Sequence, residues 1–192
     1  LAATAVQTVA RDAMAFGTAE VVEIMGRDAG WLTGATQVGR REPGMAPHLV
    51  YLPEVEVDID NFLQDCNDQY EKWGYLVVAV SEGFSFADTD IEASGDKVDE
   101  FGHARLGGVA KALAEMLEDD MGIRCRFDKL GNLQRAFSPC ASQVDHDQAY
   151  AVGEAAVSHA VAGETDVMLT TDRRTNDQYG FEADTTPQIS AG

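Results

Sequence analysis

The sequence predicts a three-layer αβα protein, in which helices cover both faces of a mainly parallel sheet. Three observations support this fold class. Strand-like apolar runs alternate along the chain with amphipathic, helix-like segments, a pattern typical of α/β proteins. Residues 75–80 are apolar throughout, as expected of a parallel strand that is buried on both faces. The chain has 192 residues, 45% of them hydrophobic, which is enough for a substantial core.

The first part of the chain is expected to run from a helix into a buried strand and then into a loop. Apolar residues recur at helical spacing over residues 3–16, and Gly17 is well placed to end this helix. Residues 19–25 form an apolar strand, followed by a helix from about Ala29 into the thirties. Glycine and proline residues at 39–48 predict a loop.

The middle of the chain contains the clearest helical pattern. Residues 59–73 carry one apolar face, and the glycine that follows them ends the helix. A short strand at residues 49–52 precedes this helix, and the strand at 75–80 follows it. The apolar face consists of Ile59, Phe62, Leu63, Cys66, Tyr70 and Trp73.

Residues 83–104 lack hydrophobic periodicity, so we expect an acidic loop insertion there. Asp88, Asp90 and Glu92 are spaced like the ligands of a calcium-binding loop. The match fails at Ala93, which occupies the position of the glycine that the sharp turn of such a loop requires. The acidic residues therefore indicate a solvated surface.

The last part of the chain is expected to add two helices and two strands. A helical pattern returns at residues 105–121, and alternating polar and apolar residues predict a strand at 124–130. Ser142 begins a capping box for a helix that ends near Ala162.

Gly153 and the alanines around it indicate that this second helix packs closely on a sheet. Residues 166–171 form the last expected strand. We therefore predict one α/β domain over residues 1–171, followed by a polar and loosely ordered tail over residues 172–192.

The composition excludes several classes of function. The formal net charge of −19 opposes binding to nucleic acids and to anionic membranes, and no apolar run is long enough to span a membrane. Three widely spaced cysteines and four unclustered histidines argue against a disulfide framework and against a Cys/His metal site. These features indicate the reducing cytoplasm, where the acidity serves solubility or adaptation to a salty interior.

Polar residues follow three of the predicted strands, at residues 25–27, 81–83 and 131–135. The ends of parallel strands share one edge of a sheet, which is where α/β proteins bind ligands. Arginine binds phosphate through two N–H groups, glutamate accepts hydrogen bonds from sugar hydroxyls, and Gly26 lets the backbone approach a ligand. The helix after Arg27 is expected to offer free N–H groups. By spacing alone, each residue taken singly is better explained as a surface residue or an ion-pair partner, and the three together weigh evenly between that explanation and a sugar-phosphate site.

Three motifs occur at these positions. Residues 21–32 read Val-Val-Glu-Ile-Met-Gly-Arg-x-x-Gly-Trp-Leu, residues 81–83 read Ser-Glu-Gly, and residues 130–135 read Leu-Gly-x-Leu-Gln-Arg. In order and spacing they resemble the C-terminal half of the 6-phosphofructokinases, over a stretch from about Ala5 to about Thr171. The resemblance implies a phosphotransferase of glycolysis that converts fructose 6-phosphate to fructose 1,6-bisphosphate, with the sugar phosphate bound by this domain.

The resemblance also implies roles for individual residues. The Met-Gly-Arg motif contacts the sugar, Glu82 binds its hydroxyl groups, and Arg135 holds the 6-phosphate. Arg126 matches an arginine that reaches the site of a neighbouring subunit, which implies a homo-oligomer, either a dimer or a tetramer. The substrate-binding residues implied in this way are Met25, Gly26, Arg27, Glu82, Arg126, Asn132, Leu133, Gln134 and Arg135.

Two residues depart from the family pattern. Asn132 stands where histidine or tyrosine is usual, although asparagine can still donate a hydrogen bond to phosphate. Thr18 stands where many members have a second cross-subunit arginine. These departures leave room for a second hypothesis, a non-catalytic half of a phosphofructokinase that binds an effector. A third hypothesis is an unrelated α/β domain that binds a sugar phosphate.

The phosphoryl donor and the catalytic residues form a separate question. Residues 47–54, 101–108 and 140–142 resemble the pyrophosphate-dependent members, so we prefer pyrophosphate to ATP as the donor. The Gly-Gly-Asp and Thr-x-Asp-x-Asp motifs that supply the family's donor site and catalytic aspartate do not occur in this sequence. The resemblance therefore implies that a missing N-terminal half holds Mg²⁺ and the donor, and we predict that these 192 residues alone are inactive.

Overall fold

The computed structural model describes residues 1–87, 94–98, 104–106, 108–171 and 187–190. The chain divides into two compact units, Leu1–Ala136 and Phe137–Gly192, and each is described here by itself. The predicted domain over residues 1–171 includes parts of both units, and its extent stays a prediction.

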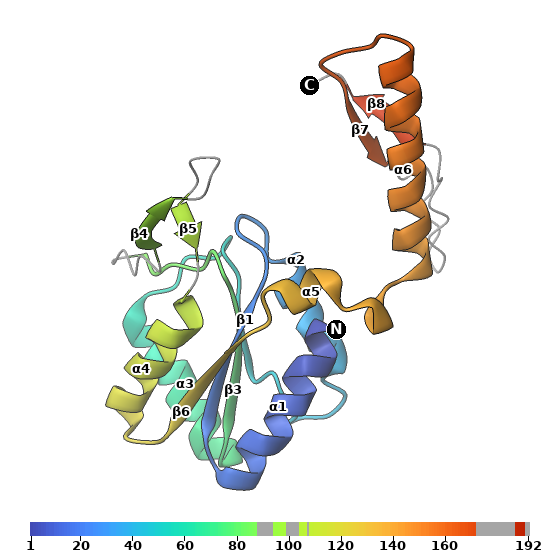
Figure 1. The fold of residues 1–192 in the computed structure, drawn as a ribbon. Coiled ribbons are helices and arrows are strands. Elements are labelled where there is room, and N and C mark those ends of the chain that lie inside the picture. Colours follow the sequence, from blue (N-terminus) through green and yellow to red (C-terminus); the bar gives the residue numbers. More distant parts are fainter. Residues whose placement is uncertain (88–93, 99–103, 107, 172–186, 191–192) are drawn as a thin grey trace. The chain divides into compact units, whose positions relative to one another are not determined.

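A four-stranded parallel sheet forms the centre of the first unit, with the strand order β2-β3-β1-β6 (Figure 1). The register pairs Ile24 with Ser81 and Glu23 with Lys129, so three neighbouring strands end at the same level. The prediction of a parallel sheet is therefore confirmed. The strands are β1 (Ala19–Ile24), β2 (Leu49–Tyr51), β3 (Leu76–Ser81) and β6 (Cys125–Lys129).

Helices cover both faces of this sheet, as Figure 1 shows, and the predicted three-layer αβα class is confirmed. Helices α3 (Ile59–Trp73) and α4 (Val109–Met121) pack on one face through a cluster that includes Phe62, Leu113 and Val78. Helix α1 (Ala2–Phe16) packs on the other face through a second cluster that includes Val6 and Val77. Alternate residues of β3 therefore serve opposite layers, which explains why this strand is apolar throughout.

Local sequence signals set the ends of the main helices. Gly17 ends α1 and Gly74 ends α3, both in the left-handed conformation that glycine adopts readily. The Asp58 carboxylate accepts a hydrogen bond from the Asn61 N–H at 2.8 Å and caps the start of α3. Trp73 belongs to the predicted apolar face of α3, but it packs against the cluster on the other side of the sheet, where α1 lies. There its ring lies so close to Gly44 that a side chain at position 44 would collide with it.

Two predicted helices differ from the structure at their boundaries. The helix expected from Ala29 is a single turn, α2 (Trp31–Gly34), continued by a 3₁₀ helix, η1 (Ala35–Gly39). The helix expected over residues 105–121 begins only at Val109. Gly108 precedes it with φ of 122°, a backbone angle that no α-helix contains.

The predicted loop at residues 83–104 is wrong in two respects. Phe84 and Phe86 are buried, and the Phe86 ring centroid lies 5.4 Å from that of Phe62 in the core beneath α3. Two strands follow, β4 (Ser94–Val98) and β5 (Ala104–Leu106), which pair antiparallel. The acidic residues at 88–92 lie outside the described residues.

The second unit contains one long helix and a two-stranded antiparallel sheet. Helix α6 (Gln143–Val161) begins at the predicted cap, where the Ser142 hydroxyl accepts the Asp145 N–H at 3.4 Å. The sheet pairs β7 (Met168–Thr171) with β8 (Pro187–Ser190), so the tail predicted to be loosely ordered contains a strand.

Within its own unit, a side chain at Gly153 would meet no described atom within 4 Å, and the predicted packing of α6 on a sheet stays a prediction. Within the described residues, no helix combines the length and the apolar character needed to cross a membrane.

Candidate functional site

The three strand ends that carry the predicted site residues are joined by hydrogen bonds. The Gly26 N–H, just past β1, donates to Glu82 Oε1 at 3.1 Å, just past β3. The neighbouring Met25 N–H donates to Gln134 Oε1 at 2.9 Å, on the segment that follows β6. Because β1 lies between β3 and β6, residues 25–27 occupy the middle, with Glu82 on one side and Gln134 on the other. The predicted gathering of these residues at one edge of the sheet is confirmed.

Backbone segments approach one another closely at this edge. Gly26 has φ of 145°, and a Cβ there would lie 2.6 Å from the Ala29 carbonyl oxygen. A Cβ on Gly83 would overlap the carbonyl oxygen of Arg27. The Ser81 hydroxyl adds a hydrogen bond to the Gly26 carbonyl. The space that a side chain at Gly26 or Gly83 would need is thus filled by the chain itself, and the two glycines fix how the strand ends meet.

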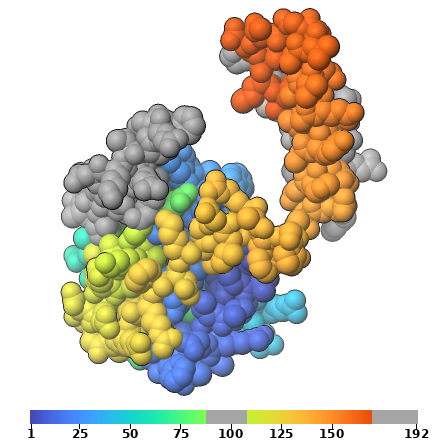
Figure 2. Space-filling view, viewed as in Figure 1, coloured from blue at the N-terminus to red at the C-terminus, as the bar shows by residue number. Residues whose placement is uncertain are grey.

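The segment after β6 turns at Gly131 into a short helix, α5 (Asn132–Ala136). Asn132, Leu133 and Arg135 are exposed, whereas Gln134 turns inward to Met25. The Arg135 guanidinium donates to Asn132 Oδ1 at 2.8 Å, an i,i+3 contact on one side of the helix. Figure 2 shows this part of the chain, in gold, at the surface of the first unit.

Charge and exposure at this edge suit an anionic ligand with hydroxyl groups. Arg27 and Arg135 are exposed and follow neighbouring strands, so both guanidinium groups are accessible from solvent. Glu82 is half-buried, with one carboxylate oxygen bound to Gly26. The guanidinium groups can bind phosphate oxygens, and the carboxylate has lone pairs left to accept hydroxyl hydrogen bonds.

The N–H groups after Arg27, which were expected to be free, are bound in part by the chain itself. The Gly30 N–H, at the start of α2, donates to Glu54 Oε1 at 2.8 Å. A Cβ at Gly30 would also lie 2.7 Å from Leu52 Cδ2, so this turn packs directly on the chain that follows β2. Helix α2 spans only four residues, and the N–H of its N-cap residue is already bound by Glu54.

Glu23 is a functional candidate that the motif-based predictions missed. Its side chain is only 2% exposed, which is unusual for a residue that ends in a carboxylate. One oxygen accepts the N–H groups of Gly108 and Ala110 at 3.2 and 3.3 Å, and the other lies 2.6 Å from the Lys129 Nζ. A charged residue within an otherwise apolar strand was the signal available in the sequence, because such residues are rarely buried unless they are paired.

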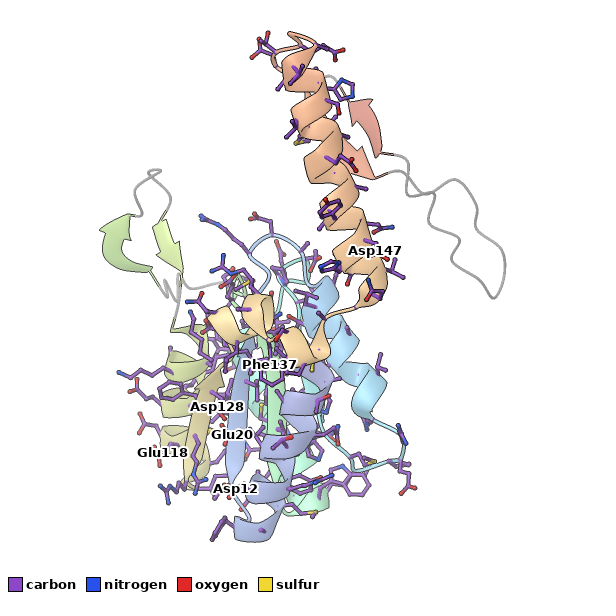
Figure 3. The ribbon with its side chains drawn as sticks, turned by 45° about the vertical axis from the view of Figure 1, so that its right-hand side comes forward. Asp12, Glu20, Glu118, Asp128, Phe137 and Asp147 are labelled. Carbon is purple, nitrogen blue, oxygen red and sulfur yellow. The ribbon has the colours of Figure 1, made fainter. Side chains whose placement is uncertain are left out.

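Arg126 lies apart from the other predicted residues. It pairs in register with Glu20, near the opposite end of β1, and its guanidinium binds the Asp12 carboxylate on α1. Figure 3 labels the acidic residues around it, Asp12 on α1, Glu20 on β1 and Asp128 on β6. Burial and the neighbouring charge of Asp128 raise the pKa of Glu20 to about 7, against the opposing effect of Arg126.

The described residues contain no set of metal ligands. No group of three or more His, Cys, Asp or Glu side chains lies together there in a way that could hold a metal ion. Magnesium, which the family resemblance implies, does not fit this part of the chain, and no chemical step is assigned to it. Burial raises the pKa of the Cys66 thiol, and burial raises that of Cys125 to about 12, so neither is an activated nucleophile.

Comparison with known proteins gives one consistent result. The profile of the family described as Phosphofructokinase matches residues 1–175. The chain is 38% identical over 167 residues to a pyrophosphate–fructose 6-phosphate 1-phosphotransferase of Halomonas elongata, covering 87% of this chain and 40% of that protein. It is 39% identical over 158 residues to the protein of the same name from Rhodospirillum rubrum, covering 78% of this chain and 39% of that protein.

A solved structure agrees with these sequence matches. The crystal structure of a pyrophosphate-dependent phosphofructokinase from Marinobacter aquaeolei is similar with a TM-score of 0.70 at 30% identity. The alignment covers 98% of this chain and 43% of that one. The chain thus spans about 40% of the length of the proteins it matches.

Proposed function

The chain belongs to the phosphofructokinase family, and from that premise we propose that its protein transfers a phosphoryl group from pyrophosphate to fructose 6-phosphate. The product would be fructose 1,6-bisphosphate. Pyrophosphate is favoured over ATP as the donor because the similar proteins from Halomonas elongata and Rhodospirillum rubrum are both named as pyrophosphate–fructose 6-phosphate 1-phosphotransferases. Because this chain matches only part of each relative, the activity is proposed for the protein in which it functions.

We propose that the edge formed by residues 25–27, Glu82 and α5 binds the sugar phosphate. The observation that carries this proposal is the joining of three strand ends by the Gly26–Glu82 and Met25–Gln134 hydrogen bonds. Exposed guanidinium groups beside them supply the positive charge that a phosphate dianion needs, in a chain whose net charge is −19.

Each residue has a distinct proposed role. Arg27 and Arg135 neutralise phosphate oxygens, and Glu82 accepts hydrogen bonds from sugar hydroxyls. Asn132 orients Arg135 through the 2.8 Å hydrogen bond to its guanidinium, which supports a role beside the phosphate. None of these groups is a general base for the attacking hydroxyl, so they hold the acceptor and leave phosphoryl transfer to residues outside the 192 of this chain.

The direct experiment measures turnover. The protein expressed from its complete reading frame is assayed with fructose 6-phosphate, Mg²⁺ and either pyrophosphate or ATP, beside residues 1–192 alone. We expect turnover with pyrophosphate for the complete protein and none for residues 1–192. Preference for ATP would contradict the donor, and binding of fructose 6-phosphate without turnover would instead support a non-catalytic, effector-binding role. No binding of fructose 6-phosphate would contradict the sugar-phosphate site itself.

We also propose that the protein is a homo-oligomer in which Arg126 reaches the site of a neighbouring copy. Its position on β6, the outer strand of the sheet in the described part of the chain, supports this role. Arg126→Ala should raise the KM for fructose 6-phosphate about tenfold in the complete protein, as expected for the loss of one charged contact. An unchanged KM would remove Arg126 from the site.

A further inference from the structure

We propose that Glu23 is a positioning residue for the sugar-phosphate site, because its buried carboxylate joins the strand ends that lead to Arg27 and Arg135 with the start of α4. The inference rests on the proposed function and extends it to a residue that lies behind the exposed groups. Glu23 precedes Met25 by two residues on β1, so any shift of its backbone is passed directly to residues 25–27.

The first link is to α4. The Oε2 atom of Glu23 accepts the N–H groups of Gly108 and Ala110 at 3.2 and 3.3 Å. Gly108 is the N-cap residue of α4 and has no side chain with which to cap the helix. The carboxylate on β1 therefore performs the capping from a distance, at the helix end whose dipole favours a negative charge.

The second link is to β6 and the segment that follows it. The Oε1 atom of Glu23 lies 2.6 Å from the Nζ of Lys129, the last residue of β6 and the register partner of Glu23. The backbone carbonyl of Glu23 also accepts the Leu130 N–H at 3.3 Å. Side chain and backbone of Glu23 thus both hold the segment that leads into α5 and Arg135.

The chemistry of this residue favours a role in positioning over packing. A carboxylate that is almost fully buried needs compensating partners, and here Oε2 accepts the helix N–H groups while Oε1 has the Lys129 ammonium as its counter-charge and no hydrogen-bond partner of its own among the described residues. A leucine would fill the same space but would leave the helix N–H groups and Lys129 without partners. Because a displacement of about 1 Å in positioning groups can cost up to about 100-fold in rate, such a link between two phosphate-binding arginines has kinetic consequences.

Glu23→Gln tests the proposal in the protein expressed from its complete reading frame. The amide can still accept from the helix but cannot pair with the Lys129 ammonium. We expect the KM for fructose 6-phosphate to rise about tenfold, the KM for pyrophosphate to stay the same and kcat to fall less than about threefold, because Glu23 touches no reacting group. The matched control is Glu115→Gln, which removes an exposed carboxylate on α4 that lies 3.6 Å from Lys111, and it should leave all three constants unchanged.

The outcomes separate this proposal from the proposed function. Absence of fructose 6-phosphate turnover in the unaltered protein overturns the function and this inference with it. Normal turnover with unaltered constants in Glu23→Gln, whatever its melting temperature, overturns the inference alone, as does an equal rise of both KM values. If Glu23→Gln does not fold, Lys129→Met breaks the same link while the carboxylate keeps its helix contacts, and the same selective rise in KM is expected.

Discussion

The two ends of strand β1 carry buried glutamates in opposite surroundings. Near the carboxyl end, Glu23 is bound by two helix N–H groups and by Lys129. Three residues earlier, Glu20 faces Asp128 and Asp12, and one arginine is shared among the three carboxylates. Both side chains are almost fully buried, so the difference lies in their partners. Burial alone therefore does not decide the electrostatic surroundings of a glutamate, because these depend on which partners the fold brings to it.

The contrast also separates the functional edge from the rest of the sheet. At the end where Glu23 lies, backbone N–H groups, a lysine and close glycine contacts hold three strand ends together. At the end where Glu20 lies, the contacts are partly solvent-exposed and their charges oppose one another. We expect substitutions at the first end to be costly and substitutions at the second end to be mild or even stabilising.

Gly83→Ala should give the largest effect and is the strongest test of a tightly packed functional edge. The added Cβ would overlap the Arg27 carbonyl oxygen, which is backbone and cannot rotate away. We expect a loss of about 3 kcal/mol in the free energy of unfolding, measured by urea denaturation. Gly34→Ala is the control, because a side chain there meets no described atom within 4 Å and should change stability by less than about 1 kcal/mol. Equal stability of the two variants would break the comparison.

Lys129→Met tests how much the ion pair with the buried Glu23 carboxylate stabilises the fold. The carboxylate would keep its helix N–H donors but lose its only cation partner among the described residues. We expect a loss of about 2 kcal/mol in the free energy of unfolding, because a buried carboxylate would lose its counter-charge. Lys111→Met removes an exposed lysine that lies 3.6 Å from Glu115 and should cost no more than about 0.5 kcal/mol. Similar losses for both lysines would show that the buried pair has no special weight.

Glu20→Gln should give the smallest effect, and one that depends on pH. The pKa of Glu20 is about 7 in the folded protein and 4.5 in a free side chain, so between these values the folded state holds a proton that the unfolded chain releases. The free energy of unfolding therefore falls as the pH rises through this window and is level above it.

Glutamine removes this dependence. Allowing for solvent screening of the cluster, we expect the variant to be more stable than the unaltered protein by about 1 kcal/mol at pH 8 and equal to it at pH 4. Urea denaturation at the two pH values checks this. Parallel curves for the two proteins across the window would contradict the raised pKa.

Several features of the fold follow from the sequence in an identifiable way. The apolar repeat of α1 and the glycine after it set that helix, and Asp58 sets the start of α3. The continuous apolar run of β3 indicates a strand with helices on both faces. Such patterns are readable because each depends on residues that are neighbours along the chain.

Other features escaped prediction because they depend on distant residues. Trp73 fits the apolar face of α3 by spacing but packs in the opposite layer, beside Gly44. The N–H groups expected to be free near Arg27 are bound in part by Glu54. The start of α4 is displaced because β5 uses residues that continue its helical pattern. In each case a tertiary contact prevailed over a local preference.

For the candidate site, the sequence alone determined which residues follow the strands and that parallel strands bring them to one edge. Arg27, Glu82 and Arg135 were identifiable from these local motifs. Only the tertiary structure decided how the edge is held together, through the pairing of Met25 with Gln134, of Gly26 with Glu82, and of Glu23 with Lys129 and α4. The physical reason is that hydrogen bonds and ion pairs of buried groups depend on distances between residues far apart in the chain, which periodicity and spacing do not encode.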